Sequence, residues 1–225
     1  MSIRPLPVAW MLVAALLLAG CGSSSSGSSS PTRTAAPSTS AASTTDAADA
    51  EVGPEGVLLE LGPALAPAST TRPGTTVDGI QCAPIEQLSY HIHAHLQVYV
   101  NGQPRQLPGA IGLVDPVAQQ TPNGPFYGAQ RCYYWLHTHA DDGIIHIESP
   151  TPQTYTLGEF FDEWGQPLTA DKVGLAQGVV TAFVNGKRWT KSPREIPLKE
   201  QAVIQLDLDT PLTRPQAVSF GSQGL

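Results

Sequence analysis

Six histidines are the residues of this sequence whose type and spacing favour metal chemistry. They lie in two short segments of the chain: His91, His93, His95, His137, His139 and His146. Side chains two residues apart on a β-strand lie on the same face, with Cα atoms about 6.6 Å apart. Two imidazoles at that spacing can converge on one ion at roughly 2.0–2.1 Å. Both segments contain His-x-His pairs, so we expect all six histidines to be metal ligands.

The second histidine segment has the pattern of a β-hairpin. We expect strands over Cys132–His139 and Ile144–Glu148, joined by a short polar loop. In this register His137 faces His146, with Cβ atoms about 4.5–5.5 Å apart, and Trp135 faces Glu148. His137, His139 and His146 then form one facet of the sheet. In local geometry alone, this facet is similar to the zinc site of α-carbonic anhydrases.

Three acidic residues accompany the hairpin: Glu148, Asp141 and Asp142. Each is a candidate ligand, or an acceptor that fixes the tautomer of a ligating imidazole. Aspartates are also common in hairpin loops, because their side chains hydrogen-bond to nearby backbone. For Asp141 and Asp142 we favour this turn role.

The identity of the metal is left open by the ligand types. Imidazole suits zinc, copper, nickel and iron. The only methionines are Met1 and Met11, so the folded part offers no thioether for Cu(I). Zn(II) and Cu(II) are therefore equal candidates.

Three functions compete for a histidine cluster of this kind. The first is a non-enzymatic protein that buffers, delivers or senses zinc or copper. The second is a metalloenzyme in which three histidines leave one coordination position open. The third is a metal-free module that responds to pH near the ordinary imidazole pKa of about 6.5. We favour the first, because the sequence shows no other catalytic constellation and no G-x-S-x-G motif.

Partners are constrained by charge. The formal net charge is −7, which argues against nucleic acid or an anionic membrane surface as the main partner. No protein partner is indicated.

The cupins also pair His-x-His with a glutamate in a β-barrel. This chain departs from their motif in the spacing between His139 and Glu148, and it lacks their glycine pattern.

The first histidine segment predicts the strand that positions half of the ligands. Over His91–Val100, apolar residues alternate with His91, His93, His95 and other polar or aromatic residues, as expected for a strand with two different faces. Asn101-Gly102 follows and favours a tight hairpin turn. We expect Gln103–Leu107 to return as the partner strand.

The remaining elements define the fold class. Thr156–Glu159 matches a capping box, and the helix that follows should end at Gly165. A third hairpin is expected over Val179–Thr190 around Asn185-Gly186, and a last strand over Ala202–Leu208. The chain is thus predicted to be mainly β: an antiparallel β-sandwich or a partly open barrel with one short helix.

Longer strings of the folded part resemble a family of bacterial secreted proteins with no assigned activity. The matching strings are His91–Leu96 (HIHAHL), Tyr134–His139 (YWLHTH) and Gly143–Pro150 (GIIHIESP). The resemblance implies that the two histidine segments belong to one site. It implies nothing about the chemistry.

The N-terminus has the features of an export signal. Arg4 precedes an apolar run, Val8–Leu18, that is too short to span a membrane. Leu18–Cys21 (LAGC) resembles the lipobox of bacterial lipoproteins. The resemblance implies a signal peptide over residues 1–20, a lipidated Cys21 and a membrane-anchored protein of the cell envelope. The alternative is a plain signal peptide followed by an incidental cysteine.

A tether and one domain follow Cys21. Residues 21–55 are rich in Ser, Thr, Ala and Pro, so they lack the apolar surface needed to offset conformational entropy. We expect a flexible tether with a span of roughly 30 Å. Residues 56–225 suit a single β-rich domain.

Two cysteines remain in the folded part once Cys21 is lipidated. Outside the cytoplasm, Cys82 and Cys132 most simply form a disulfide. The alternative, in which both are thiolate metal ligands, is less favoured in an oxidising compartment.

Overall fold

The computed structural model describes residues 51–69, 73–221 and 225, all within one compact unit, Asp46–Leu225. The expected signal peptide, Cys21 and the tether as far as Ala50 lie outside the described residues. In the part that is described, no helix is both long and apolar enough to cross a membrane. The same part is mainly β with one α-helix, as the sequence predicts.

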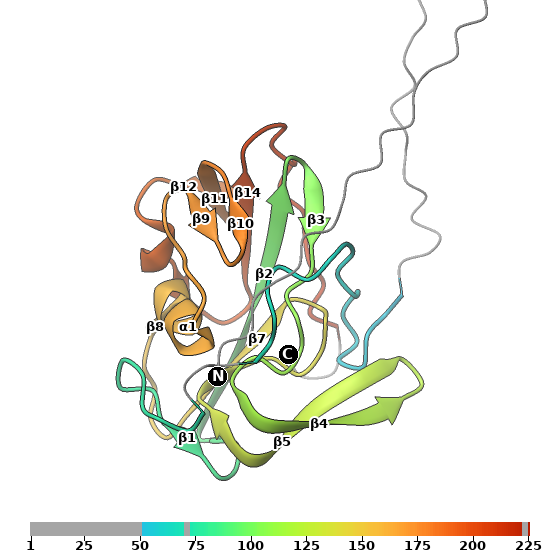
Figure 1. Cartoon of the computed structure of the whole chain (residues 1–225), viewed down its shortest axis with the longest axis vertical. Helices are drawn as coiled ribbons and strands as arrows, with labels where there is room; N and C mark the ends of the chain where they lie inside the picture. Colours follow the sequence, from blue (N-terminus) through green and yellow to red (C-terminus); the bar gives the residue numbers. More distant parts are fainter. Residues whose placement is uncertain (1–50, 70–72, 222–224) are drawn as a thin grey trace, which may run out of the picture. The chain divides into compact units, whose positions relative to one another are not determined.

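The described elements, in chain order, are β1 (Cys82–Ala83), β2 (Tyr90–Val100), β3 (Gln103–Arg105), β4 (Leu113–Thr121), β5 (Gly124–Tyr134), β6 (Leu136–His137), β7 (Ile144–Ser149), β8 (Tyr155–Thr156), α1 (Leu157–Trp164), β9 (Lys172–Val173), β10 (Ala176–Gln177), β11 (Val180–Val184), β12 (Lys187–Trp189), the 3-10 helix η2 (Pro193–Glu195), β13 (Pro197–Leu198) and β14 (Ala202–Leu208). The largest sheet has seven strands in the order β12-β11-β14-β2-β7-β6, with β3 also paired to β2 (Figure 1). Three smaller sheets are β1-β5-β4, β10-β9 and β13-β8. The described strands do not close into a barrel, so the fold is the sandwich-like alternative.

The hairpin after the first histidine segment is confirmed. β3 returns antiparallel to β2, with Val100 opposite Gln103. Asn101 and Gly102 both have positive φ, 51° and 72°, as a two-residue hairpin turn with the right-handed strand twist requires. Asn185 and Gly186 repeat this geometry between β11 and β12, with φ of 49° and 75°.

Both faces of β2 are covered. Its apolar face contributes Ala94, Leu96 and Val98 to the core. On the other face, His93 and His95 are only 3% and 2% exposed. A small cluster of Val57, Ile144 and Phe220 packs on this side, and the His95 ring lies 6.5 Å from the ring of Phe220. The central histidines therefore lie inside the fold.

One strand pair departs from the antiparallel prediction. β14 is paired parallel with β2 over Ala202–Leu208. A two-residue turn imposes antiparallel pairing, but β14 follows β2 only after a long connection and is free to run in either direction. Hairpin signals could therefore not reveal this pairing.

The predicted strand Cys132–His139 is interrupted at Trp135, between β5 and β6. Its first part belongs to β5, which pairs with β4 in a long ribbon that the sequence analysis did not predict (Figure 1). The alternation in this ribbon is weak, since most residues from Asp115 to Gln120 are exposed polar or small residues on both faces. Only β6 joins the large sheet and carries His137 to the cluster.

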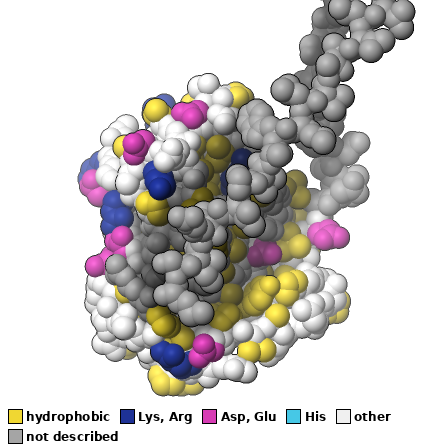
Figure 2. Space-filling model, in the orientation of Figure 1, with side chains coloured by type: hydrophobic (Ala, Val, Ile, Leu, Met, Phe, Trp, Pro, Cys, Tyr) yellow, Lys and Arg dark blue, Asp and Glu magenta, His cyan; other side chains and the backbone are white. Residues whose placement is uncertain are grey.

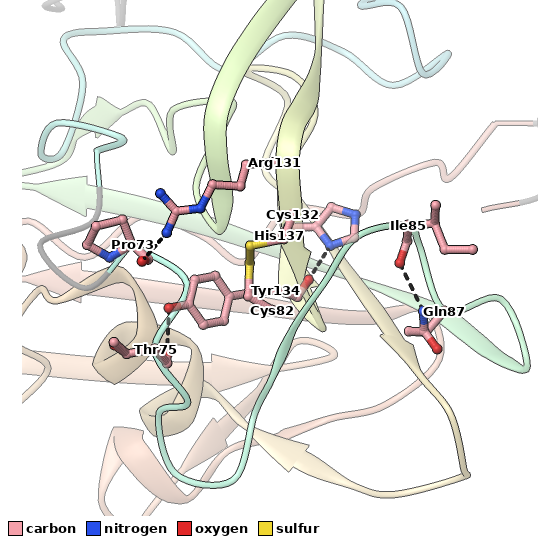
Figure 3. The surroundings of a disulfide bond; sticks show 9 residues. All are labelled: Pro73, Thr75, Cys82, Ile85, Gln87, Arg131, Cys132, Tyr134 and His137. Atoms are coloured by element: carbon pink, nitrogen blue, oxygen red, sulfur yellow. Dashed lines mark hydrogen bonds between the residues drawn. A yellow bond between two sulfur atoms is a disulfide. The ribbon is translucent and has the colours of Figure 1, made fainter.

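The disulfide between Cys82 and Cys132 is present, so neither sulfur is a thiolate ligand (Figure 3). It fastens β1 to β5, where Cys82 is also paired with Tyr134. The hydroxyl of Tyr134 donates a hydrogen bond to the carbonyl of Thr75, at 2.6 Å. Together these links hold the segment before β2 against β5.

The helix forms as predicted. In the capping box, the Thr156 side chain accepts from the Glu159 N–H and the Glu159 carboxylate accepts from the Thr156 N–H. Gly165 ends the helix with φ 76°, the left-handed conformation that glycine adopts without strain. Phe160, Phe161 and Trp164 on this helix are fully buried in the core.

Glu163 of α1 supports a pH-dependent prediction for stability. It is 0% exposed and accepts a hydrogen bond from the Leu136 backbone. Burial raises the pKa of Glu163 well above its ordinary 4.5, and the hydrogen bond offsets this only in part. The folded state therefore holds this proton more tightly than the unfolded state, and stability falls as pH rises above about 4.5.

We expect Glu163→Gln to remove this loss of stability at higher pH. Relative to the unaltered protein, the variant should gain unfolding free energy between pH 5 and pH 8, by ~1.4 kcal/mol for each pH unit that lies below the raised pKa. Urea unfolding of both metal-free proteins at the two pH values measures the difference. A difference that is the same at both pH values would contradict this role of Glu163.

Charged side chains of both signs are interspersed over the described part of the surface seen in Figure 2. Lysines and arginines form no continuous patch on this face. Most of the tip of the β4–β5 ribbon carries neither charge.

Candidate metal centre

β7 brings the two histidine segments together. It lies between β2 and β6 in the large sheet. His146 on β7 is paired with His93 of β2 on one side and with His137 of β6 on the other. The predicted pairing of His137 with His146 is confirmed, and it extends to a row of three histidines across three adjacent strands.

A second row lies next to the first. Glu148 of β7 is paired with His91 of β2. On its other side, the Glu148 N–H donates to the carbonyl of Trp135, at 2.8 Å, which agrees with the predicted register. Glu148 therefore lies on the same face of the sheet as His146, two residues along the strand.

Among the residues that the structure describes, two groups of side chains could hold a metal ion. The first consists of His137, His139, His146 and Glu148, which are all buried. The second consists of His91, His93 and His146, of which His91 is exposed. Within each group the ligand atoms lie within 4.8 Å of one another.

His137 and His139 are oriented by backbone carbonyls. The Nδ1 of His137 is 2.8 Å from the Tyr134 carbonyl oxygen (Figure 3), and the Nδ1 of His139 is 2.6 Å from that of Tyr127. A carbonyl oxygen only accepts, so both Nδ1 atoms carry the proton. In each neutral ring the Nε2 atom then presents a lone pair, as a metal ligand does.

These two lone pairs face each other. The Nε2 atoms of His137 and His139 are 3.1 Å apart in the buried interior. Neither can donate to the other while both Nδ1 atoms are protonated, so a cation between them is required for attraction. An ion about 2.05 Å from both nitrogens would subtend an angle of roughly 98°, close to that of a tetrahedral site.

His146 is fixed from the opposite direction. Its Nε2 lies 2.7 Å from Oε1 of Glu55, and because a carboxylate accepts, this nitrogen donates. Its Nδ1 points to the cluster, 3.1 Å from Nε2 of His93. A carboxylate bonded to the far nitrogen of a ligating histidine orients the ring and makes it more basic.

The protonation states of the cluster histidines are set by burial and by the carboxylates of Glu55 and Glu148. Burial is the main cause that lowers the pKa of His93 to about 3 and of His139 to about 4, and it lowers that of His137 well below 6.5. Burial would also lower the pKa of His146, but Glu148 and Glu55 together raise it to about 9. At neutral pH the metal-free cluster thus has neutral imidazoles at His137 and His139.

His95 is the predicted ligand that the structure leaves outside both groups. It lies on the same face of β2 as His93 but faces Ile144 across the sheet. It makes a hydrogen bond with the Asp142 backbone, and burial lowers its pKa to about 4.

Asp141 and Asp142 join neither group; Asp142 takes the turn role, whereas Asp141 bonds the backbone of a distant segment. Asp141 Oδ1 accepts from the Gly109 N–H at 2.6 Å, and Asp142 Oδ1 accepts from the Ile144 N–H at 3.1 Å. Asp142 is nonetheless buried, and burial, then the charge of Glu55, raises its pKa to about 8.

Two glutamates of the cluster were missed by the sequence analysis. Glu55 lies just before the expected start of the domain at Gly56, yet it is only 6% exposed and bonded to His146. Glu86 lies between β1 and β2, with Oε1 3.5 Å from Nε2 of His139. Each stands outside any histidine motif, so no local pattern could have revealed it.

Five of the histidines and the three glutamates therefore form one largely buried cluster of metal-ligand types beside strands β2, β7 and β6. Its first group has three imidazole nitrogens and one carboxylate, a set that suits Zn(II) and Cu(II) as well as other divalent transition metals. No protein-family model, curated protein or solved structure matches this chain.

Proposed function

We propose that this protein binds a divalent transition-metal ion, zinc or copper, through His137, His139, His146 and Glu148. We further propose that it acts in the cell envelope, anchored by a lipid on Cys21, where it buffers, delivers or senses that ion. The LAGC sequence at Leu18–Cys21 supports the anchor. The disulfide between Cys82 and Cys132 supports an oxidising compartment.

The observation that carries the metal proposal is the contact between His137 and His139. In both rings the Nδ1–H donates a hydrogen bond to a backbone carbonyl. The two unprotonated Nε2 atoms lie 3.1 Å apart. A metal-free hydrogen-bond network has no proton for this contact when both rings are neutral. A bound cation satisfies both lone pairs at once.

The depth of the site favours slow exchange of the ion. The four ligands are at most 6% exposed. Within the cluster, His91 and Glu86 are partly exposed, each with about 35% of its side chain accessible. An ion would therefore enter and leave on the side of these two residues, and storage or sensing fits better than rapid transfer from an open surface site.

A metalloenzyme is the second candidate, and Glu86 is the observation that favours it. Its carboxylate approaches His139 from the accessible side without belonging to the first group. Burial raises the pKa of Glu86, as suits a group that exchanges protons with a reactant next to a metal. Hydrolysis of a model ester by the loaded protein, abolished in Glu86→Gln, would support this candidate over the first.

Metal binding should stabilise the fold measurably. An ion present at about 100 times its dissociation constant adds ~2.7 kcal/mol, which for a domain of this size raises the Tm by roughly 5–10 °C. Thermal unfolding of the full, untagged chain, stripped with a chelator and then titrated with Zn²⁺ or Cu²⁺, measures this shift. Mg²⁺ is the control and should leave the Tm unchanged, because it prefers oxygen ligands. No shift with either transition metal would favour the metal-free module.

A further inference from the structure

Two histidines of the second group, His91 and His93, are not used by the ion proposed above. His91 and His93 come from β2, and they meet His146 of β7 with all three ligand atoms within 4.8 Å. Nε2 of His93 is 3.1 Å from Nδ1 of His146. The group is thus a second His-x-His pair, completed by a histidine from the neighbouring strand.

Glu148 lies between the two groups. Its Oε1 is 3.1 Å from Nε2 of His91, 3.4 Å from Nδ1 of His146 and 3.7 Å from Nε2 of His137. Its Oε2 is buried and has no hydrogen-bond partner among the described residues. A carboxylate in this position can bind two ions, which in two-metal sites lie about 3.5–4 Å apart.

The number of donors exceeds what one ion can use. A zinc ion is almost always bound by four ligands, whereas the two groups together supply five histidines and Glu148. His146 donates from Nε2 to Glu55 and so offers only Nδ1, which can bind a single ion. With two ions bound, the 3.1 Å contact of Nδ1 with Nε2 of His93 assigns His146 to the second ion.

We propose that the cluster is a two-metal centre, in which His91, His93 and His146 hold a second divalent transition-metal ion and Glu148 bridges it to the first. This proposal rests on the proposed function. The first ion then keeps His137, His139 and Glu148 as protein ligands. Three protein ligands leave a coordination position open, which is the arrangement of zinc ions that bind water or substrate.

Counting ions in matched variants tests the proposal. The full, untagged chain is stripped, reloaded with Zn²⁺ and freed of excess metal, and zinc per chain is measured by elemental analysis and native mass spectrometry. We expect two ions in the unaltered chain and one in His91→Gln/His93→Gln. His91 is exposed, so His91→Gln alone leaves the core intact. It should weaken the binding of the second ion only. His95→Gln is the control on the same strand and should keep both.

The outcomes separate the two proposals. One ion in the unaltered chain overturns the two-metal centre and leaves the proposed function standing, whereas no ion overturns both. Two ions that persist in His91→Gln/His93→Gln also overturn it. Loading with Cu²⁺ gives an independent readout, because two coppers bridged by Glu148 should show magnetic coupling in electron paramagnetic resonance. Two uncoupled copper signals would contradict the bridge.

Discussion

His137→Gln and His139→Gln should each eliminate the tightest metal-binding event, with a loss of affinity of roughly 100-fold or more. Loss of a group that merely orients a ligand costs about 10–100-fold, and these two residues are ligands themselves. Each ring is oriented by a backbone carbonyl, from Tyr134 and Tyr127, which directs its Nε2 into the cluster. Competition of the loaded protein with a chelator of known affinity measures the change.

The matched control is His95→Gln. His95 is as buried as His139, at 2% exposed, and lies in the same sheet as His137, but it is outside both ligand groups. It should keep the affinity of the unaltered protein. Unchanged affinity in both His137→Gln and His139→Gln would refute the site, provided that circular dichroism shows both variants folded.

Removing the disulfide should have the largest effect on stability. Cys82 and Cys132 close a loop of 50 residues, and the loop-closure entropy of the unfolded chain predicts a loss of about 4 kcal/mol for Cys82→Ala/Cys132→Ala. For a domain of this size that corresponds to a Tm lower by roughly 10 °C. Chemical denaturation of the metal-free variant and of the unaltered protein measures the loss.

The same variant tests how the disulfide supports the metal centre. The bond fastens β1 beside Tyr134, whose carbonyl orients His137, and Glu86 lies in the segment that follows β1 (Figure 3). We expect a smaller loss of metal affinity than in His137→Gln, because every ligand remains. A loss of stability below about 1 kcal/mol would contradict the loop-entropy argument.

Several parts of the fold could be predicted from local signals. The turns at Asn101-Gly102 and Asn185-Gly186, the capping box at Thr156 and the facing pair of His137 and His146 are all fixed by residues within one hairpin or one helical turn. Here the residue type itself restricts the backbone. Period-two alternation then places the side chains on known faces.

Other parts depend on contacts between distant segments. The parallel pairing of β14 with β2 and the docking of β7 beside β2 join strands about 50 or more residues apart. The turn at Trp135 divides a stretch whose residues all favour a strand. Since none of these features leaves a local pattern, the sequence predicted two histidine segments but not how they combine.

The metal site shows the same division. Five of the six predicted histidines enter the two groups, because strand spacing alone brings each His-x-His pair together. His95 follows the same spacing but faces Ile144 instead of a ligand. This difference depends only on the register between β2 and β7. Glu55 reaches His146 from the N-terminal segment, and no spacing rule connects two residues so far apart.

Metal content is the quantity that decides whether the cluster is a metal site. The full chain, without a polyhistidine tag, should be produced in a bacterial host, purified without chelators and analysed for all transition metals. We predict zinc or copper at one or more ions per chain, with His139→Gln prepared in parallel and containing less. A chain that is purified without metal and takes up neither ion on titration would contradict the proposed site and leave the histidines as a hydrogen-bonded network.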